Sequence, residues 1–406
     1  MKWEKVKLGE LYEVHNGLSK AGKFFGEGYP FLTFSTVFNN YFIPKQITDL
    51  VQSTEKEQES YSIRRGDVFV TRTSETSDEL GMSCVALKDY PMATYNGFTK
   101  RMRPITNRVF PEYIGYYMRL PSFRGEFRAF STMTTRASLR NEDLLGLEVK
   151  LPSIEIQKQI ADILSAYDDL IENNQKQIKL LEEAAQRFYK EWFVDLRFPG
   201  HENTKIVDGV PEGWRVASIA DICDTVGGGT PSTKIQSYYE KGDILWVTPT
   251  DITRNFSLAL LDTEKKITPE GLKNSSAKML PAETILMTSR ASVGFFGMCK
   301  YEVCTNQGFI SCIPKRENLQ MYLLFNLKSR VEEIRQKAGG STYLEISKTV
   351  FRELKIILPK DEVLAEYQKN VHDIFDEIYC RTEMIKSLVD MRNRLLPKLM
   401  SGEVEV

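Results

Sequence analysis

The stretch PSIEIQKQIADILSAYDDLIENNQKQIKLLEEAAQRFYKEWFVD, residues 152–195, decides how this chain is organised. Its apolar residues recur at alternating steps of four and three as far as Leu170, and again beyond Asn174. This spacing predicts one long amphipathic helix with the apolar seam of a coiled coil. Two consecutive steps of four around Asn174 resemble a stutter. About 40 residues at about 1.5 Å each form a rod of roughly 60 Å, which either spaces domains apart or needs a partner helix.

A second stretch of the same kind lies near the other end of the chain, at residues 359–400. It reads PKDEVLAEYQKNVHDIFDEIYCRTEMIKSLVDMRNRLLPKLM, and two arginines fill the gaps in its apolar seam. Sliding the first stretch along the chain places Pro152 on Pro359, and the seams then match. A second alignment pairs Gln157 with Gln368 and shifts the start of the helix by four residues. Under either alignment, the two helices are copies of one another.

The segments before the two helices also repeat. Trp3 aligns with Trp214, and each is followed by a short helical turn and a loop that contains glycine. Short strands are expected next in each half. The stretch 31–38 corresponds to 243–252 in the second half, 64–74 corresponds to 280–292, and 144–152 corresponds to 351–359. The predicted fold is α+β: two mixed α/β domains with two long antiparallel coiled-coil helices and pseudo-twofold symmetry. The predicted boundaries are 1–151 (first domain), 152–195 (helix), 196–211 (linker), 212–358 (second domain) and 359–406 (helix).

Composition places the chain among ordinary globular proteins. It has 406 residues, of which 42% are hydrophobic and 27% charged. No apolar run approaches the roughly 20 residues that span a bilayer, and the segment MKWEKVKLGE lacks the pattern of a signal peptide. Six cysteines without CxxC pairing predict free thiols in a reducing cytoplasm. The three histidines lie far apart in the sequence, so no metal site is expected.

Charge is unevenly distributed, although the net charge is only -1. Nine basic and two acidic residues lie between Phe98 and Arg140. The helix at 153–195 has the opposite balance, with nine acidic and five basic residues. A basic segment of this kind is what local binding to phosphate requires, and the total charge conceals it.

Several motifs together resemble the specificity subunits of type I restriction–modification enzymes. They are a tryptophan followed by a glycine-containing loop in each half, WVTPTDI at 246–252, NQGF at 306–309, LPSIEIQ at 151–157 and RLLPKLMSGEV at 394–404. The resemblance covers the whole chain. It implies two target-recognition domains, each reading one half of a split site in double-stranded DNA, and a coiled coil that acts as a ruler between them.

The same resemblance implies partners and cofactors. Two methyltransferase subunits would dock on the conserved helices, and restriction subunits would join them for cleavage. The specificity subunit itself would be non-catalytic and hold no cofactor. S-adenosylmethionine would belong to the methyltransferase subunits, and ATP and Mg to the restriction subunits.

Candidate DNA-binding residues are donors and acceptors at strand ends and in loops. Arginine can bind guanine bidentately, and lysine or arginine can clamp phosphates without reading sequence. Solvated surface charge and ordinary loop polarity remain the alternative reading of each position. The candidates for base reading or backbone contact are Lys20, Lys23, Arg72, Thr73, Ser74, Lys100, Arg101, Arg136, Arg140, Lys234, Ser289 and Arg290.

Other readings of the sequence stay open at this stage. Asp251 followed by Glu264 and Lys266 could hold Mg²⁺ in a nuclease, and a single-chain nuclease or methyltransferase is the alternative function. The chain has no Asn- or Asp-Pro-Pro-aromatic stretch, which a methyltransferase site would need. Surplus apolar surface at the helix ends predicts either a folded-back domain or a partner protein. The candidate partner-binding residues are Phe188, Tyr189, Trp192, Phe193, Leu395 and Leu399.

Overall fold

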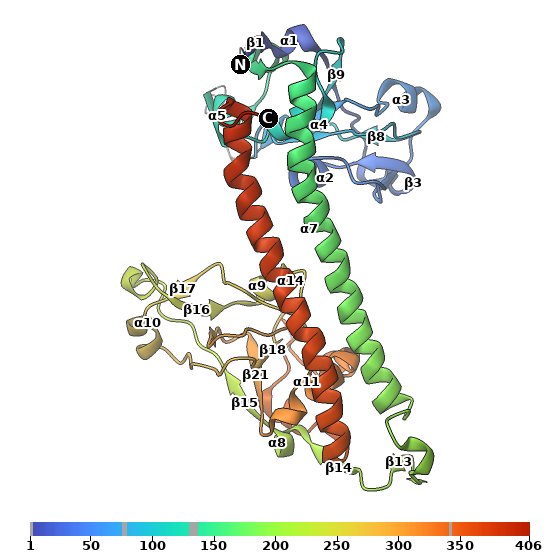
Figure 1. The fold of residues 1–406 in the computed structure, drawn as a ribbon, viewed down its shortest axis with the longest axis vertical. Coiled ribbons are helices and arrows are strands. Elements are labelled where there is room, and N and C mark those ends of the chain that lie inside the picture. The colour runs from blue at the N-terminus through green and yellow to red at the C-terminus, as the bar shows by residue number, and fades with distance from the viewer. Residues whose placement is uncertain (1–2, 75–78, 130–136, 341–342) are drawn as a thin grey trace. The chain divides into compact units, whose positions relative to one another are not determined.

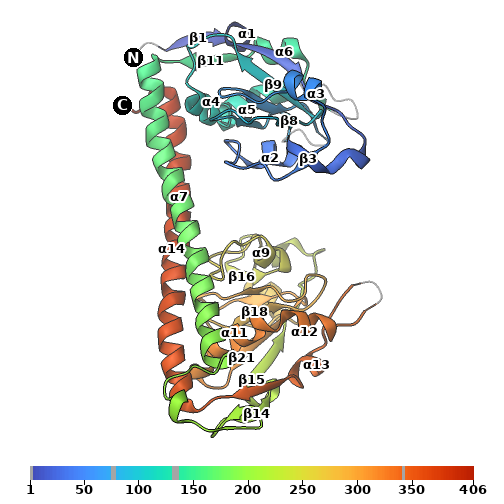
Figure 2. The same ribbon diagram turned by 90° about the vertical axis from the view of Figure 1, so that its right-hand side faces the viewer.

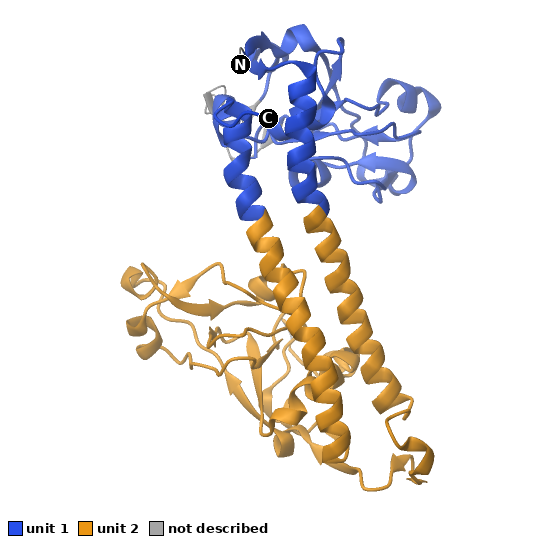
Figure 3. Ribbon diagram, viewed as in Figure 1, with its two compact units in different colours: residues 1–169, 389–406 blue, residues 170–388 orange. Residues whose placement is uncertain are grey.

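The computed structural model describes residues 3–74, 79–129, 137–340 and 343–406. It divides into two compact units, the first made of residues 1–169 and 389–406 and the second of residues 170–388 (Figure 3). Each unit contains a domain of short strands and helices together with a part of each long helix. None of the helices among the described residues is both long and apolar enough to cross a membrane.

The first unit is built on two small sheets (Figure 1). One is antiparallel, with the strand order β2 (Tyr12–Asn16), β9 (Thr99–Pro104), β5 (Val68–Thr71), β7 (Ser83–Val85). The other has the order β4 (Leu50–Val51), β3 (Phe25–Leu32), β8 (Thr94–Tyr95), and β3 runs parallel to β8. Two further antiparallel pairs are β1 (Glu4–Lys7) with β11 (Glu148–Leu151), and β6 (Thr73–Ser74) with β10 (Ala137–Ser138).

The second unit repeats this topology. Its antiparallel sheet has the order β15 (Cys223–Gly227), β21 (Phe309–Pro314), β18 (Ile285–Thr288), β19 (Phe296–Gly297). Its mixed sheet has the order β17 (Lys266–Ile267), β16 (Ile244–Val247), β20 (Cys304–Thr305), and β16 is parallel to β20. The pair β14 (Arg215–Ser218) with β22 (Lys355–Leu358) corresponds to β1 with β11. The mixed α and β content and the internal repeat are therefore as predicted.

Short helices connect these strands (Figure 2). In the first unit they are α1 (Leu8–Leu11), α2 (Phe34–Asn39), α3 (Glu55–Ser60), α4 (Pro111–Tyr117), α5 (Pro121–Ala129) and α6 (Asn141–Gly146). In the second unit they are α8 (Ile219–Ile222), α9 (Pro249–Thr253), α10 (Pro269–Lys273), α11 (Gln320–Ser329), α12 (Val331–Gln336) and α13 (Lys348–Arg352).

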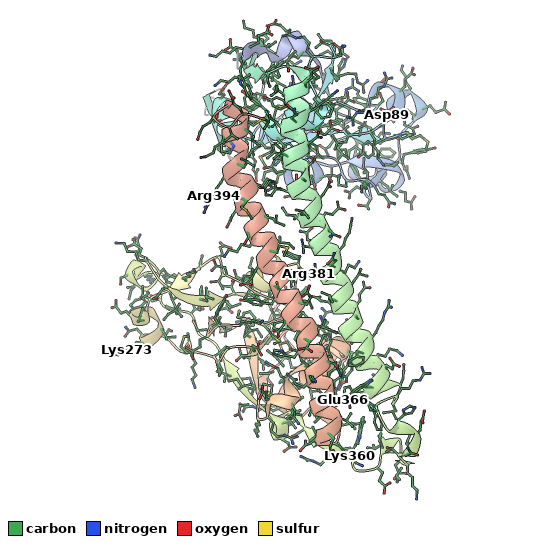
Figure 4. The ribbon with its side chains drawn as sticks, viewed as in Figure 1. Asp89, Lys273, Lys360, Glu366, Arg381 and Arg394 are labelled. Atoms are coloured by element: carbon green, nitrogen blue, oxygen red, sulfur yellow. The ribbon has the colours of Figure 1, made fainter. Side chains whose placement is uncertain are left out.

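The two long helices form where their apolar periodicity predicts them. The first, α7, spans Ile154–Tyr189 and continues into a π-helical turn at Lys190–Val194. The second, α14, spans Asp361–Ser401. In the second unit they pair antiparallel: Phe188 stacks on Tyr367 with 5.7 Å between ring centroids, and Arg381 (Figure 4) donates to Asn174 over 3.2 Å.

A polar contact accompanies the apolar packing of the long helices in the first unit. Arg392 of α14 forms an ion pair with Asp168 of α7, and its guanidinium lies 5.4 Å from the centroid of the Tyr41 ring. Tyr116 of α4 donates its hydroxyl to the other oxygen of Asp168 at 2.5 Å. Burial, followed by the Asp168 charge, raises the pKa of Tyr116. The three side chains tie both long helices to the first domain.

Two glutamines show how the helix starts correspond. Gln157 accepts a hydrogen bond from the backbone N–H of Phe110 at 2.8 Å, and Gln368 accepts one from the N–H of Met321 at 2.9 Å. Both contacts join the start of a long helix to the helical segment that precedes it in its own unit. The structure therefore supports the alignment of Gln157 with Gln368 at the helix starts, rather than that of Pro152 with Pro359.

Some predicted strands are wrong in part. The stretch 31–38 leaves its strand after Leu32 and becomes α2, because the Thr33 hydroxyl accepts from the Thr36 N–H and caps a helix. The stretch 243–252 turns into α9, where the Asp251 carboxylate accepts from the Thr248 N–H at 2.7 Å. The stretches 144–152 and 351–359 begin with the ends of α6 and α13 before their strands start. In each case a local helical turn interrupts a run that was read as one strand.

The predicted linker at 196–211 contains ordered structure. A two-stranded hairpin joins β12 (Ile206–Val207) to β13 (Val210–Pro211). The Phe198 ring is 4% exposed and lies 4.8 Å from the Trp214 ring between centroids. A single buried aromatic residue thus fixes a segment whose composition indicates only a loop.

Substitution of Gln157 tests the contact that anchors α7. Gln157 is 1% exposed and also donates to the backbone oxygens of Arg108 and Pro152. Gln157→Ala leaves these buried groups without partners, so the free energy of unfolding should fall by about 1–3 kcal/mol. The exposed Gln175→Ala on the same helix is the control, with a change within about 0.5 kcal/mol. Urea denaturation followed by circular dichroism measures both, and equal effects would contradict the anchoring role.

Candidate functional site

A cleft of about 520 Å³ in the first unit brings predicted site residues together. It lies where the end of β2, the start of β9 and the start of α6 meet. We call it the basic cleft, and it is lined by Asn16, Arg72, Lys100, Leu139, Arg140, Asn141 and Glu142. The structure thus groups three of the cations that were predicted individually from the sequence.

Lys100 is the most buried cation of the basic cleft, with 6% exposure. Its ammonium donates to the side-chain oxygens of Asn16, at 3.4 Å, and Asn141. Burial and then the charge of Arg72 lower the pKa of Lys100. An anion in the cleft would relieve both effects, because it would compensate a partly desolvated positive charge. The local electrostatics therefore favour a negatively charged ligand.

Arg72 and Arg140 differ in how firmly they are held. The Arg72 backbone donates to Phe98 and accepts from Leu139, at 3.0 and 2.9 Å. Its Nε atom is buried and has no hydrogen-bond partner among the described residues. The Arg140 side chain is 76% exposed and pairs with Asp143 at 2.9 Å, and this hydrogen bond raises the pKa of Arg140. The exposed Arg140 side chain would have to leave Asp143 to bind a ligand, whereas backbone hydrogen bonds hold Arg72 on both sides.

The second unit has a cation at the corresponding place, on a different element. The Ile346 N–H donates to the Ser289 carbonyl at 3.0 Å, and the Leu139 N–H donates to the Arg72 carbonyl at 2.9 Å in the first unit, so Ile346 corresponds to Leu139. Lys348 begins α13 as Asn141 begins α6. A β-carbon built on Gly227, the counterpart of Asn16, would lie 3.0 Å from the Lys348 ammonium. The sequence analysis missed Lys348, which an alignment of the segments before the last strands could have identified.

The remaining predicted cations lie in varied surroundings. Lys20 is paired with Glu57 at 2.8 Å, and the hydrogen bond from Lys20 lowers the pKa of Glu57. Lys23 is exposed, with its ammonium 5.1 Å from the Phe24 ring. Lys234 is exposed beside a second cleft, of about 590 Å³. Arg290 is exposed and lies 3.6 Å from Glu345.

Of the four other predicted residues, one is buried, two belong to a strand and one is not described by the structure. Ser289 is 3% exposed. Thr73 and Ser74 belong to β6, which pairs with β10, and Arg136 lies outside the described residues.

Arg101 requires a correction. It was expected on the surface as a phosphate clamp, but it is 3% exposed. Its guanidinium donates to the Ser62 carbonyl at 2.8 Å and stacks on the Tyr95 ring at 5.5 Å. On β9, residues 99, 100, 101 and 102 are all buried, so this part of the strand has no face open to solvent. We therefore remove Arg101 from the candidate DNA surface.

The candidate partner-binding residues are packed within their own units. Tyr189 and Trp192 are 3% and 7% exposed, and Tyr189 accepts a hydrogen bond from Asn326 at 2.7 Å. Phe193 packs on Tyr322 and Tyr367, with 4.7 and 4.8 Å between ring centroids.

The remaining three of these residues have similar environments. Phe188 lies 4.8 Å from the Trp192 ring between centroids. Leu399 is 1% exposed in the core of the first unit, and Leu395 packs against that core. Packing onto the adjacent domain, one of the two readings left open, accounts for this apolar surface. Partner binding by these six residues stays a prediction.

Two features singled out from the sequence have structural explanations. A β-carbon on Gly17 or Gly228 would lie 2.0 or 2.1 Å from the carbonyl oxygen of Asn96 or Asn306, so each loop needs glycine for close backbone approach. Asp251, the candidate nuclease residue, accepts from the Thr248 N–H at 2.7 Å and the Glu264 N–H at 2.8 Å. Its carboxylate therefore caps α9 and holds a loop, which is a structural role.

Comparison with known proteins relates the fold to a family. The family model described as the type I restriction modification DNA specificity domain matches residues 1–183 and 211–389. The MjaIX specificity subunit of Methanocaldococcus jannaschii is 38% identical over 173 residues, which cover 42% of this chain and 39% of that relative. The HindI specificity subunit of Haemophilus influenzae is 24% identical over 99% of both chains.

A solved structure has the same fold. The S subunit of a type I restriction–modification system from M. genitalium aligns with a TM-score of 0.58 and 16% identity. The alignment covers 98% of this chain and 96% of that one.

Substitution of Arg101 tests whether it belongs to the interior. Because its guanidinium is buried and bonded, Arg101→Ala should lower the free energy of unfolding by about 1–3 kcal/mol. Lys23→Ala, at an exposed site on the same domain, should change it by less than about 0.5 kcal/mol. Chemical denaturation of both variants measures the difference. A stable Arg101→Ala protein would return this arginine to the candidate surface.

Proposed function

Since the chain belongs to the type I restriction–modification DNA specificity family, it is the non-catalytic DNA-recognition subunit of such a system, and we propose that its two domains read the two halves of a divided DNA site. We assign residues 1–151 and 212–358 to the two target-recognition domains. The proposal rests on the repeated topology of the two units, because two copies of one reading domain suit two half-sites.

The DNA surface that we propose for the first domain is centred on the basic cleft. Arg72, Lys100 and Arg140 line this cleft and supply its positive charge. Lys23 is a further exposed cation of the same domain, and Thr73, Ser74 and Arg136 lie near these residues in the sequence. For the second domain we propose Lys234, Arg290 and Lys348. Exposed cations such as Arg140 are suited to phosphates, which set register, and we propose Arg72 as the residue of this group that reads a base.

We propose that α7 and α14 form an antiparallel coiled coil with pseudo-twofold symmetry, whose length sets the distance between half-sites. The antiparallel contacts in the second unit and the matching glutamine contacts support this. Helices of 36 and 41 residues give lengths of about 54 and 62 Å at about 1.5 Å per residue. On this proposal, residues 196–211 join the halves without reading DNA.

The partners that we propose are two methyltransferase subunits, joined by restriction subunits. Apolar residues that remain exposed on the long helices are candidates for contact with them. They are Leu170, Leu180 and Met384 in the second unit, at 50%, 62% and 47% exposure, and Met391 in the first unit, at 48%. Apolar residues enrich the core of protein interfaces. This chain would hold no cofactor, S-adenosylmethionine would bind in the methyltransferase subunits, and ATP and Mg in the restriction subunits. The capping role of Asp251 and the identity of the relatives disfavour a single-chain nuclease or methyltransferase.

The basic cleft can be tested by changing Arg140. Arg140→Ala should weaken binding to duplex DNA and lower the magnitude of the slope of log K against log salt by about 1. The variant would make one fewer phosphate contact, so binding would release fewer counterions. Arg394→Ala, an exposed arginine on α14 (Figure 4), is the matched control and should leave the slope unchanged. Fluorescence anisotropy of the complex with methyltransferase subunits, at several salt concentrations, measures both. An unchanged slope for Arg140→Ala would exclude it from the DNA surface.

The ruler can be tested by lengthening both helices together. Seven residues inserted after Asp169 in α7 and seven after Leu388 in α14 fall at the borders between the two units. A heptad adds two turns in a coiled coil and keeps the same face of the helix in the seam. The spacer should lengthen by no more than about three base pairs, since seven residues rise about 10 Å and B-DNA rises about 3.4 Å per base pair. Methylome sequencing should show this with both half-sites unchanged, and an unchanged spacer would refute the ruler.

A further inference from the structure

We propose that Glu283, His372 and Asp376 form a site for a divalent transition-metal ion in the second unit. One ligand atom from each residue lies within 4.8 Å of the others. His372 and Asp376 stand four residues apart on α14, so they share one face of the helix. Glu283 comes from the loop just before β18. An imidazole with two carboxylates is a ligand set that zinc, cobalt and nickel accept.

The two carboxylates lie at different ring nitrogens of His372, so coordination of one ion requires one of them to move toward the nitrogen that binds the metal. Glu283 Oε2 lies 3.1 Å from His372 Nε2, and Asp376 Oδ2 lies 3.4 Å from His372 Nδ1. Ligand atoms in a tetrahedral site with bonds of about 2.1 Å are about 3.4 Å apart. An imidazole binds a metal through one ring nitrogen, so His372 would give up one of these two contacts. The side chains of Glu283, His372 and Asp376 are 24%, 29% and 46% exposed, which leaves a path for an ion and for a water ligand.

The surrounding charges favour a cation at this place. Lys300 contacts Asp376 Oδ1 at 2.6 Å and leaves Oδ2 directed at His372. The ammonium also lies 4.7 Å from the Tyr379 ring, which helps to hold it. With a neutral imidazole, two carboxylates and one ammonium leave one negative charge uncompensated. Lys300 therefore acts as an outer partner that orients a ligand carboxylate.

The first unit has none of these side chains at the corresponding positions. Gly66 is the counterpart of Glu283, because each residue stands two positions before the equivalent strand, β5 or β18. The Glu283 N–H donates to the Cys299 carbonyl at 2.6 Å, and the Gly66 N–H donates to the Ala86 carbonyl at 2.8 Å. The glycine has a φ of 89° and the glutamate a φ of 59°. A glutamate in this left-handed conformation is strained, whereas the glycine at the equivalent position of the first unit is not.

The other positions differ as well. Counting from Gln157 and Gln368, His372 corresponds to Ala161, and Asp376 corresponds to Ser165. Counting from Ala86 and Cys299, Lys300 corresponds to Leu87. The polar group is thus specific to the second domain, where a bound ion would clamp the loop before β18 to α14. Spacing along the sequence could not reveal it, because 89 residues separate Glu283 from His372.

The experiment uses the full chain after treatment with a chelator. Isothermal titration with Zn²⁺ should show one ion per chain, the melting temperature should rise with Zn²⁺ concentration, and Co²⁺ should give visible absorption bands. Glu283→Gly and His372→Ala introduce the residues found at the equivalent positions of the first unit, so the fold should tolerate them. Each should weaken Zn²⁺ binding by about 100-fold or more, since one of three ligands is lost.

His201→Ala is the control, because His201 lies in the segment 196–211 and belongs to no such group among the described residues. It should bind Zn²⁺ like the unchanged protein. Absence of Zn²⁺ binding, or equal binding by all variants, would overturn the proposal and leave the three residues as an ion-pair cluster only. DNA binding by metal-free protein should persist, so this result and the result for the DNA surface are independent.

Discussion

The apolar seam of a long amphipathic helix must be covered, and this constraint organises each unit of the protein. A single helix of this length exposes its seam to water unless another element packs along it. In the second unit α7 and α14 cover one another, and the aromatic residues at the end of α7 pack on Tyr322 of the adjacent domain. In the first unit Leu399 and Met400, at the end of α14, enter the domain core with Leu164 of α7. Each domain is therefore completed by helix residues distant in sequence.

The same constraint explains where polar groups occur in the seam. Asp168 pairs with Arg392 and accepts a hydrogen bond from Tyr116, so partly buried charges are compensated within the first unit. Asn174 and Arg381 meet in the second unit, at the point where the apolar steps of α7 change. Polar seam positions of this kind commonly fix the register of paired helices at a cost in stability. The proposed ruler would need such a register, because it would have to keep the two reading domains at a fixed distance.

The sequence was informative wherever the signal was periodic or repeated. The long helices and the repeated domains could be predicted because apolar spacing and matched motifs extend over many residues. Local capping was harder to foresee: Thr33 and Thr248 end their strands and begin helices within runs that resemble strands. For the candidate DNA-binding site, Arg101 and Lys348 show what could not be predicted from the sequence. The burial of one and the position of the other depend on which strand or helix lies opposite, and one sequence without its fold does not specify that.

The central claim is that two autonomous domains each read one half of a DNA site. Exchanging residues 212–358 for the corresponding domain of another family member, in a host that supplies the methyltransferase subunits, tests it most directly. Single-molecule methylome sequencing should then show one half-site replaced, with the other half-site and the spacer retained. A change in both half-sites, or in neither, would contradict the account.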